Sequence, residues 1–207
     1  TTNMVTLAGE YKSTKEIDKS VIADIVRNTV KDIGYEQEGF HWQHLKIYNE
    51  LHPQSADIAL GTDDFGAGDQ GLMFGYACRE TPNYMPLAIY LSHRIVEMLT
   101  RHRKNGTDWL GPDAKSQVTI EYNDDAEPVR IAKIVCSTQH ADWISIDDVR
   151  ANVKNFIQSM PEMELLDNDT EFYINPTGRF VSGGPDGDAG LTGRKIIVDT
   201  YGGYSPH

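Results

Sequence analysis

Hydrophobic and polar residues alternate at the start of the chain, and the pattern then changes to a helical period. Residues 4–11 alternate well enough to predict a β-strand. Ser13 and Glu16 have the spacing of a capping box at the start of a helix, and Gly34 stands where a C′ glycine would end it. A short strand at 45–51 completes a β-α-β order. The expected apolar face of the helix consists of Ile17, Val21, Ile22, Ile25, Val26, Val30 and Ile33.

The next part of the chain is polar at first and then strongly apolar. Residues 52–66 are polar and lack periodicity, which predicts a mobile loop. Residues 72–78 are apolar and fit a buried strand. A helix is predicted over 83–104, where the basic RHRK segment at its C-terminal end suits the helix dipole. The residues expected to face inward are Met85, Ile89, Ile95, Val96 and Leu99.

Two strands and a helix with clear end signals follow. Strands 115–122 and 128–137 flank the acidic turn Asn-Asp-Asp, a pattern typical of a β-hairpin. Ser145 marks the start of a helix that ends near Pro161, and residues 171–174 form a last short strand. The expected apolar face of this helix consists of Ile146, Val149, Val153, Phe156 and Ile157.

These elements predict an α+β protein built from repeats. The order from residue 71 to 175 is β-α-β-β-α-β, a known two-layer unit. The opening β-α-β matches the second half of that unit, and a strand at 194–200 is placed to begin a third copy. We therefore expect one complete repeat and two partial ones, each partial repeat leaving a sheet face uncovered.

Composition narrows the class of protein. The net charge of −12 argues against general nucleic-acid binding and against an anionic membrane surface. Cys78 and Cys136 lie in apolar surroundings without metal-ligand spacing, so we expect reduced thiols in a cytoplasmic protein. No apolar run is long enough to span a bilayer. The chain begins at Thr1 and stops in mid-loop at His207, so we expect that both ends are truncated.

The glycine-rich stretch 173–207 carries the strongest sign of a ligand site. Its glycines allow close approach of the backbone to a ligand. An aromatic ring for stacking, a carboxylate for an amine and cations for phosphates together describe a nucleotide site. The residues that supply these groups are Arg179, Phe180, Asp186, Asp188, Arg194 and Lys195. The alternative is a long surface loop whose charges only face water.

Four motifs carry a resemblance to a known family. GAGDQGLMFGYA and the glycine-rich stretch are the most specific of them. The motifs occupy residues 66–77, 112–122 (PDAKSQVTIEY), 137–140 (STQH) and 174–203. In this order they resemble the signatures of methionine adenosyltransferases, also called S-adenosylmethionine synthetases, and the resemblance covers almost the entire chain.

The resemblance implies an architecture and a reaction. Family members have an intertwined three-domain α+β fold with active sites shared across a homodimer, often paired into a homotetramer. The thioether sulfur of L-methionine attacks C5′ of ATP, giving S-adenosylmethionine and tripolyphosphate, which is hydrolysed to diphosphate and phosphate. Mg²⁺ and K⁺ are the cofactors. The implied parts of this chain are the end of an N-terminal domain (1–52), a mobile lid (53–66), a central domain (67–182) and the start of a C-terminal domain (183–207).

The resemblance also assigns site residues. A neutral thioether needs no general base, so cations that stabilise charge on the triphosphate are the expected catalytic groups: Lys115, Arg194 and Lys195. The implied ATP-binding residues are Asp113, Ala114, Lys115, Arg179, Phe180, Asp188, Arg194 and Lys195, with Phe180 stacking on adenine. The implied methionine-binding residues are Glu10, Gln54 and Asp188, and Asp69 is expected to face the partner's site. Asp186 is interpreted as a solvated turn acid and His140 as structural.

Some family features depart or are missing. In the lid, Ala56, Ala59 and Leu60 replace the usual residues, while Gln54 is kept. The GHPDK, GGGAFSGKD and DRSAAY segments, which carry the family's metal ligands and catalytic histidine, do not occur, so no metal ligand is expected in this chain. We therefore expect the isolated chain to be inactive. Two other readings remain: a non-catalytic chain that pairs with a complete synthetase subunit, and an adenine-nucleotide-binding protein of unrelated chemistry.

Overall fold

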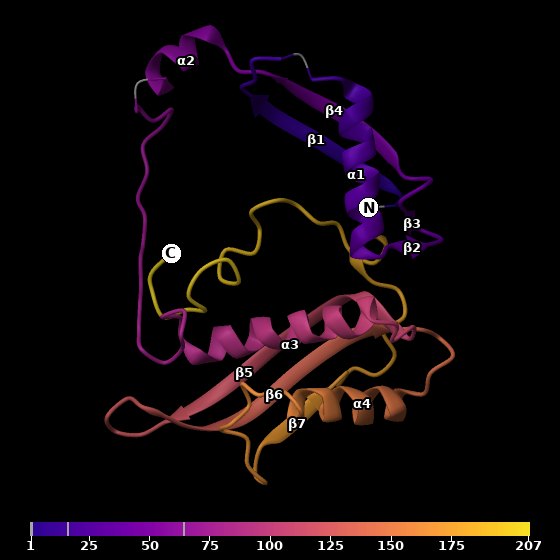
Figure 1. Cartoon of the computed structure of the whole chain (residues 1–207), viewed down its shortest axis with the longest axis vertical. Coiled ribbons are helices and arrows are strands. Elements are labelled where there is room, and N and C mark those ends of the chain that lie inside the picture. Colours follow the sequence, from indigo (N-terminus) through magenta and orange to yellow (C-terminus); the bar gives the residue numbers. More distant parts are fainter. Residues whose placement is uncertain (1, 16, 64) are drawn as a thin grey trace. The chain divides into compact units, whose positions relative to one another are not determined.

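The alternating residues at the start of the chain form a strand in the structure, a computed structural model that describes residues 2–15, 17–63 and 65–207. The chain divides into unit 1, Thr1–Met73 with Pro185–Gly190, and unit 2, Phe74–Gly184 with Leu191–His207. Both units mix helices with small sheets, so the predicted α+β class is confirmed (Figure 1). None of the described helices has the length and apolar character needed to cross a bilayer.

Unit 1 is built around a parallel strand pair. β1 (Met4–Tyr11) pairs with β4 (Lys46–Pro53) in a continuous register from Met4↔Lys46 to Tyr11↔Pro53. The crossover between them contains α1 (Lys19–Ile33), as parallel strands require. The predicted β-α-β order is therefore confirmed. The structure adds a short hairpin that the sequence did not predict, β2 (Glu36–Gln37) with β3 (Phe40–His41).

The ends of α1 confirm one predicted cap and correct the other. Gly34 has φ 96° and donates its N–H to the carbonyls of Val30 and Lys31, as expected of a C′ glycine. The N-cap is Asp18, whose carboxylate accepts from the Ser20 N–H at 2.8 Å. Ser13 is therefore not the cap. The other half of the predicted box, Glu16, lies outside the described residues.

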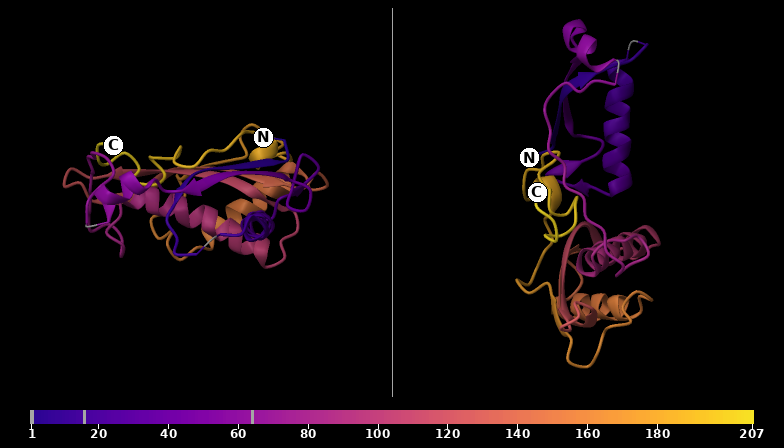
Figure 2. Two further views of the ribbon diagram at one scale, coloured as in Figure 1. Left: turned by 90° about the horizontal axis from the view of Figure 1, so that it is seen from above. Right: turned by 90° about the vertical axis from the view of Figure 1, so that its left-hand side faces the viewer.

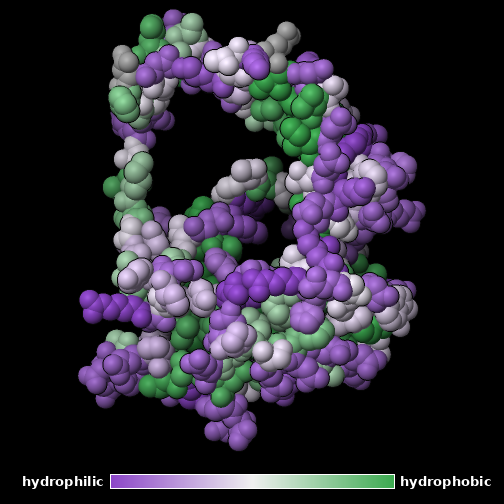
Figure 3. Space-filling view, viewed as in Figure 1, coloured by the Kyte–Doolittle hydropathy of each residue, from purple (hydrophilic) through white to green (hydrophobic). Residues whose placement is uncertain are grey.

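The predicted apolar face of α1 is only partly buried. Val30 packs with Phe40 and Leu45 in the core of unit 1, and Val26 is half-buried against it. In contrast, Val21 and Ile25 are 51% and 59% exposed, and Ile33 is exposed as well. A two-stranded sheet is too narrow to cover the whole face, and Figure 3 shows hydrophobic surface beside α1.

The segment predicted as a loop over 52–66 contains a helix. α2 spans Ala56–Thr62, with Asp57 in its first turn. Its alanines and leucine favour a helix, and Asp57 suits the positive end of the helix dipole. No residue of α2 is buried, and Leu60 is 84% exposed.

Unit 2 is a three-stranded sheet with helices on one face. β5 (Leu110–Tyr122) and β6 (Pro128–His140) form the predicted antiparallel hairpin, and β7 (Glu171–Ile174) pairs with β6 in parallel. α3 (Leu87–Lys104) and α4 (Ile146–Gln158) cover the same face of the sheet (Figure 2). Between helices and sheet lies the main core, which includes Leu91, Ile95, Leu99, Val118, Ile131, Ile134, Val149, Val153 and Ile157.

The helix ends in unit 2 have identifiable causes. Ser145 caps α4 as predicted, accepting from the Asp148 N–H at 3.1 Å. α3 begins at Leu87 rather than at residue 83, because Pro86 precedes it and the Glu80 carboxylate accepts the Leu87 N–H at 2.7 Å. The basic residues at the end of α3 lie in its last turn, as predicted.

Two predicted strands do not form. Residues 72–78 are extended but belong to no sheet, with Leu72 and Met73 more than 80% exposed. Residues 194–200 form turns, and Ile196 is half exposed. A strand needs a neighbour for its backbone hydrogen bonds, and no described segment pairs with either one. The described part of the predicted six-element unit is therefore α-β-β-α-β.

Candidate functional site

The start of β5 carries three of the predicted ATP-binding residues, Asp113, Ala114 and Lys115. Ala114 and Lys115 pair with Thr138 and Ser137 of β6. The side chain of the next residue, Ser116, reaches α3, so Lys115 faces the opposite, open side of the sheet and is exposed. The cationic group is therefore available for a ligand on that side.

The glycine-rich loop begins where β7 ends. Asn175 follows β7, is 1% exposed and has φ 42°. Its side-chain amide takes the place of a strand neighbour for Thr138, accepting the Thr138 N–H and donating to the Thr138 carbonyl, each at 2.9 Å. The Asn175 carbonyl accepts from the Gly178 N–H at 2.9 Å and closes the first turn of the loop. The chain thus leaves the sheet at a fixed angle.

The predicted adenine-stacking residue, Phe180, is held by its backbone. The His140 N–H donates to the Phe180 carbonyl at 2.9 Å, and the Phe180 N–H donates to His140 Nε2 at 3.0 Å. His140 Nδ1 lies 2.9 Å from the Ala141 carbonyl. Nε2 thus accepts from Phe180, while Nδ1 faces the Ala141 carbonyl. The predicted structural role of His140 is confirmed by these contacts.

The structure joins the start of β5 to this loop. One carboxylate oxygen of Asp113 accepts the Gly184 N–H at 2.9 Å, across 71 residues of sequence. In the same loop, Arg179 forms an ion pair with Asp142 at 2.6 Å, with both side chains about two-thirds exposed or more. Such a pair is weak in water, so the guanidinium is open to exchange for a ligand anion.

The other residues assigned to ATP, methionine or the partner's site are exposed. Arg194 and Lys195 lie in the turns of unit 2 that follow Leu191. Asp188 belongs to the segment of unit 1 that follows Pro185, and Asp69 accepts a hydrogen bond from the adjacent Gln70 N–H. Within the described residues, Arg194, Lys195 and Asp188 form no ion pair. Their roles remain predictions.

Asp186 is an exposed residue in a turn, in line with its interpretation as a solvated turn acid, but its carboxylate also contacts another segment. It ends a short 3₁₀ turn, Gly184–Asp186. Its carboxylate lies beside Gly39, so close that a Cβ at Gly39 would fall 1.7 Å from Oδ1. Although Asp186 is exposed overall, its carboxylate therefore packs against backbone.

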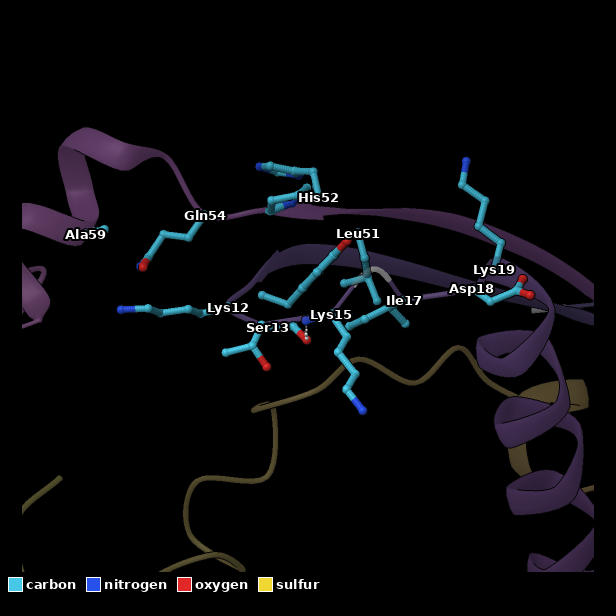
Figure 4. Close-up of a pocket in the computed structure, with 13 residues that line it drawn as sticks. Lys12, Ser13, Lys15, Ile17, Asp18, Lys19, Leu51, His52, Gln54 and Ala59 are labelled. Carbon is cyan, nitrogen blue, oxygen red and sulfur yellow. Dashed lines mark hydrogen bonds between the residues drawn. The ribbon is translucent and has the colours of Figure 1, made fainter.

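In unit 1, the ends of β1 and β4 border a hollow of about 1140 Å³. Gln54 lines it, and its N–H donates to the Tyr11 carbonyl at 2.9 Å. The side chains of Gln54 and Lys12 extend toward α2 (Figure 4), where Lys12 pairs with Asp63. Nearby, Glu10 Oε1 lies 3.7 Å from His52 Nε2. The structure thus brings two of the three predicted methionine-binding residues, Glu10 and Gln54, to one end of the strand pair.

The described residues contain no group of three His, Cys, Asp or Glu side chains arranged to hold a metal ion. They therefore do not fit a Mg²⁺ site by themselves, and no chemical step is assigned to a metal here.

Sequence reasoning missed the contribution of Gln139. This side chain is 4% exposed and bonds to both Asp113 and Val181. The signal was present in the STQH motif, where four successive polar residues end a strand whose preceding residues are largely apolar. Such a polar run at a strand end is typical of side chains that bind a neighbouring loop.

Comparison with known proteins identifies the group to which these motifs correspond. Residues 64–180 match the family model of the S-adenosylmethionine synthetase central domain. Residues 182–207 match the model of the C-terminal domain and residues 1–56 that of the N-terminal domain. Together the three models cover nearly the whole chain.

Curated relatives agree with the family models. The chain is 51% identical over 213 residues to the S-adenosylmethionine synthase of Paramagnetospirillum magneticum and 54% identical over 213 residues to S-adenosylmethionine synthase 2 of Rhodospirillum rubrum. It is 53% identical over 215 residues to the S-adenosylmethionine synthase of Rhodospirillum centenum. Each alignment covers all of this chain but only 55%, 54% and 54% of the respective relative. The chain therefore spans about half the length of the curated relatives it matches.

Proposed function

The chain belongs to the S-adenosylmethionine synthetase family, and from this premise we propose that it supplies ATP- and methionine-binding residues to a methionine adenosyltransferase. In this reaction the methionine sulfur forms a bond to C5′ of ATP while the C5′–oxygen bond breaks. The electron pair leaves with tripolyphosphate, which water then cleaves to diphosphate and phosphate. The product sulfonium carries the positive charge, so no proton is transferred in the first step.

One observation carries the nucleotide part of this proposal. The hydrogen bond from the Gly184 N–H to Asp113 unites two segments that are far apart in sequence and that both carry assigned ATP residues. On this basis Lys115, Arg194 and Lys195 stabilise negative charge on the triphosphate. Phe180 stacks on adenine, with Arg179 alongside, and Asp113 and Ala114 contribute the β5 side of the nucleotide site.

The methionine part rests on unit 1 and on the glycine-rich loop. A carboxylate is the natural partner of the methionine ammonium, and Glu10 and Asp188 supply this group. Gln54 offers both a donor and an acceptor at the edge of the hollow. Asp69 is assigned to the partner's site, which requires the homodimer that we propose, with a homotetramer as the larger assembly.

We also propose Mg²⁺ and K⁺ as the cofactors and the cytoplasm as the location. We propose that the chain comprises the end of an N-terminal domain (1–52), a lid (53–66), a central domain (67–182) and the start of a C-terminal domain (183–207). Ala59 and Leu60 make this segment less polar than the family pattern, and Ala59 lines the hollow.

Binding of AMP-PNP, a non-hydrolysable ATP analogue, tests this proposal directly on the 207-residue chain. Lys115→Ala should weaken binding about tenfold or more, because a charge-assisted hydrogen bond contributes about 1.5–3 kcal/mol. Lys104→Ala is the matched control, since Lys104 ends α3 on the helix-covered side of the sheet. No detectable AMP-PNP binding, or equal binding by wild type and Lys115→Ala, would overturn the proposal.

Formation of S-adenosylmethionine from ATP and methionine, followed by mass spectrometry, then separates catalysis from binding. Product formation that Lys115→Ala reduces mainly in kcat supports charge stabilisation in the transition state. Nucleotide binding without product is the result expected of the isolated chain, and it agrees equally with a non-catalytic partner of a complete subunit.

A further inference from the structure

Gln139 lies between the two segments assigned to the nucleotide. It is the penultimate residue of β6 and is 4% exposed. Its Oε1 accepts the Asp113 N–H at 3.3 Å, and its Nε2 donates to the Val181 carbonyl at 2.8 Å. We refer to these two hydrogen bonds together as the Gln139 bridge.

The backbone of β5 is shaped to receive this side chain. The strand register shifts between Leu110 and Ala114, so residues in this stretch are released from regular pairing with β6. The Asp113 N–H consequently bonds to a side chain. The same residue accepts the Gly184 N–H through its carboxylate, so Asp113 is fixed at two points.

Two glycines leave the space that the Gln139 side chain occupies. A Cβ on Gly111 would lie 2.6–2.8 Å from the Cγ, Cδ and Cβ atoms of Gln139. A Cβ on Gly183 would lie 2.9 Å from its Cδ and Oε1 and 3.0 Å from the Asp113 Cβ. Neither glycine has a positive φ, so space rather than backbone conformation requires glycine at both positions.

We propose that Gln139 is a positioning residue that sets the separation between Asp113–Lys115 and the loop Phe180–Gly184, and thereby the placement of the residues assigned to ATP. The inference rests on the proposed function, because these are the segments assigned to ATP. The glutamine amide offers the required acceptor and donor at once, on two atoms that face the two segments. A carboxylate at this position keeps the acceptor for Asp113 but places an oxygen against the Val181 carbonyl.

The first test compares Gln139→Glu with the control Gln158→Glu, an exposed position at the end of α4. Three quantities are measured on the 207-residue chain: the Kd of AMP-PNP, the Kd of methionine, and amide hydrogen exchange by mass spectrometry. For Gln139→Glu we expect the Kd of AMP-PNP to rise about tenfold, because a buried hydrogen bond is lost. Exchange in the peptides covering 111–115 and 180–184 should become faster, while the Kd of methionine should stay unchanged. The control should match wild type in all three.

A second perturbation acts from the other side of the bridge without adding charge. Gly183→Ala places a methyl group against Gln139 and Asp113 and should produce the same selective loss of AMP-PNP affinity. Gly75→Ala is its control, because a Cβ there meets open space. Should Gln139→Glu fail to fold, this pair decides the matter.

The outcomes distinguish this inference from the proposed function. If wild type binds AMP-PNP and both variants bind it equally well with unchanged exchange, the positioning role is wrong while the function stands. If affinity for AMP-PNP and methionine falls together, Gln139 stabilises the fold in general and the inference is also wrong. If wild type does not bind AMP-PNP, the proposed function fails and the nucleotide role of Gln139 fails with it, while the exchange rates still decide whether the bridge orders the loop.

Discussion

Replacement of Asn175 by alanine tests how the glycine-rich loop is attached to the sheet. The side chain is 1% exposed, and its amide is hydrogen-bonded to both the N–H and the carbonyl of Thr138. Alanine removes both bonds and leaves two backbone groups without these partners in the interior. It must also adopt φ 42°, which asparagine tolerates better than alanine.

The magnitude follows from these two effects. A buried donor or acceptor that loses its partner costs about 1–3 kcal/mol, and the left-handed conformation costs alanine about 1 kcal/mol more. With two such groups, Asn175→Ala should lower the free energy of unfolding by about 3–7 kcal/mol, a large part of the roughly 5–15 kcal/mol typical of a folded protein.

Urea unfolding, followed by circular dichroism and tryptophan fluorescence, measures this change. Trp109 is a suitable reporter because it is 9% exposed and belongs to the core of unit 2. Asn175→Gly loses the same amide but accepts the positive φ, so it should be the less destabilised of the two. Asn155→Ala, at an exposed position of α4, is the matched control. An Asn175→Ala variant within about 0.5 kcal/mol of wild type would refute the reasoning, since surface substitutions have effects of that size.

Two further predictions concern titratable groups. The Arg130 guanidinium, and to a lesser degree the Thr170 hydroxyl, hold the pKa of Asp167 well below its ordinary value. Because the folded-state pKa is lowered, the ionised carboxylate stabilises the fold above the unfolded-state pKa of about 4, and this stabilisation is lost as the pH falls. Asp167→Asn should therefore lower the urea midpoint at pH 7 and make the midpoint decrease less steeply between about pH 5 and 3. An unaltered pH profile would contradict this. Burial raises the pKa of the Cys136 thiol to about 12, so iodoacetamide should label the half-buried Cys78 but spare Cys136 at about pH 8 until urea is added. Rapid labelling of Cys136 in the folded chain, measured from peptide masses, would show that the Cys136 thiol is accessible and would contradict this prediction.

The fold could be predicted from sequence where its signals are local. The alternation at residues 4–11, the Ser145 cap and the Gly34 terminus each depend on neighbours within a few residues, and all are confirmed. Residues 72–78 and 194–200 have equally apolar sequences but form no strand. Whether an apolar segment becomes a strand depends on a partner elsewhere, which periodicity does not reveal.

The candidate site was likewise predicted only where its signals are local. Its motifs identified the segments around Asp113 and Phe180, and the structure brings the first segment to Gly184. The Gln139 contacts were missed because they depend on an irregular register in β5 and on glycines 72 positions apart. Neither a helical nor a strand period reports such packing. The family roles of Arg194, Lys195 and Asp188 stay predictions, since their side chains are exposed and lack ion pairs in the described chain.

The fit of Gln139 against Gly111 and Gly183 has a consequence for evolution and for engineering. The Gln139 side chain fills the space beside both glycines, so a larger side chain at Gly111 or Gly183 is tolerated only when residue 139 becomes smaller. A smaller residue 139 then loses the amide contacts. Mutations at these sites are therefore epistatic. A chimaera assembled from two relatives must take all three residues from the same parent, even though they lie on three different segments of the chain.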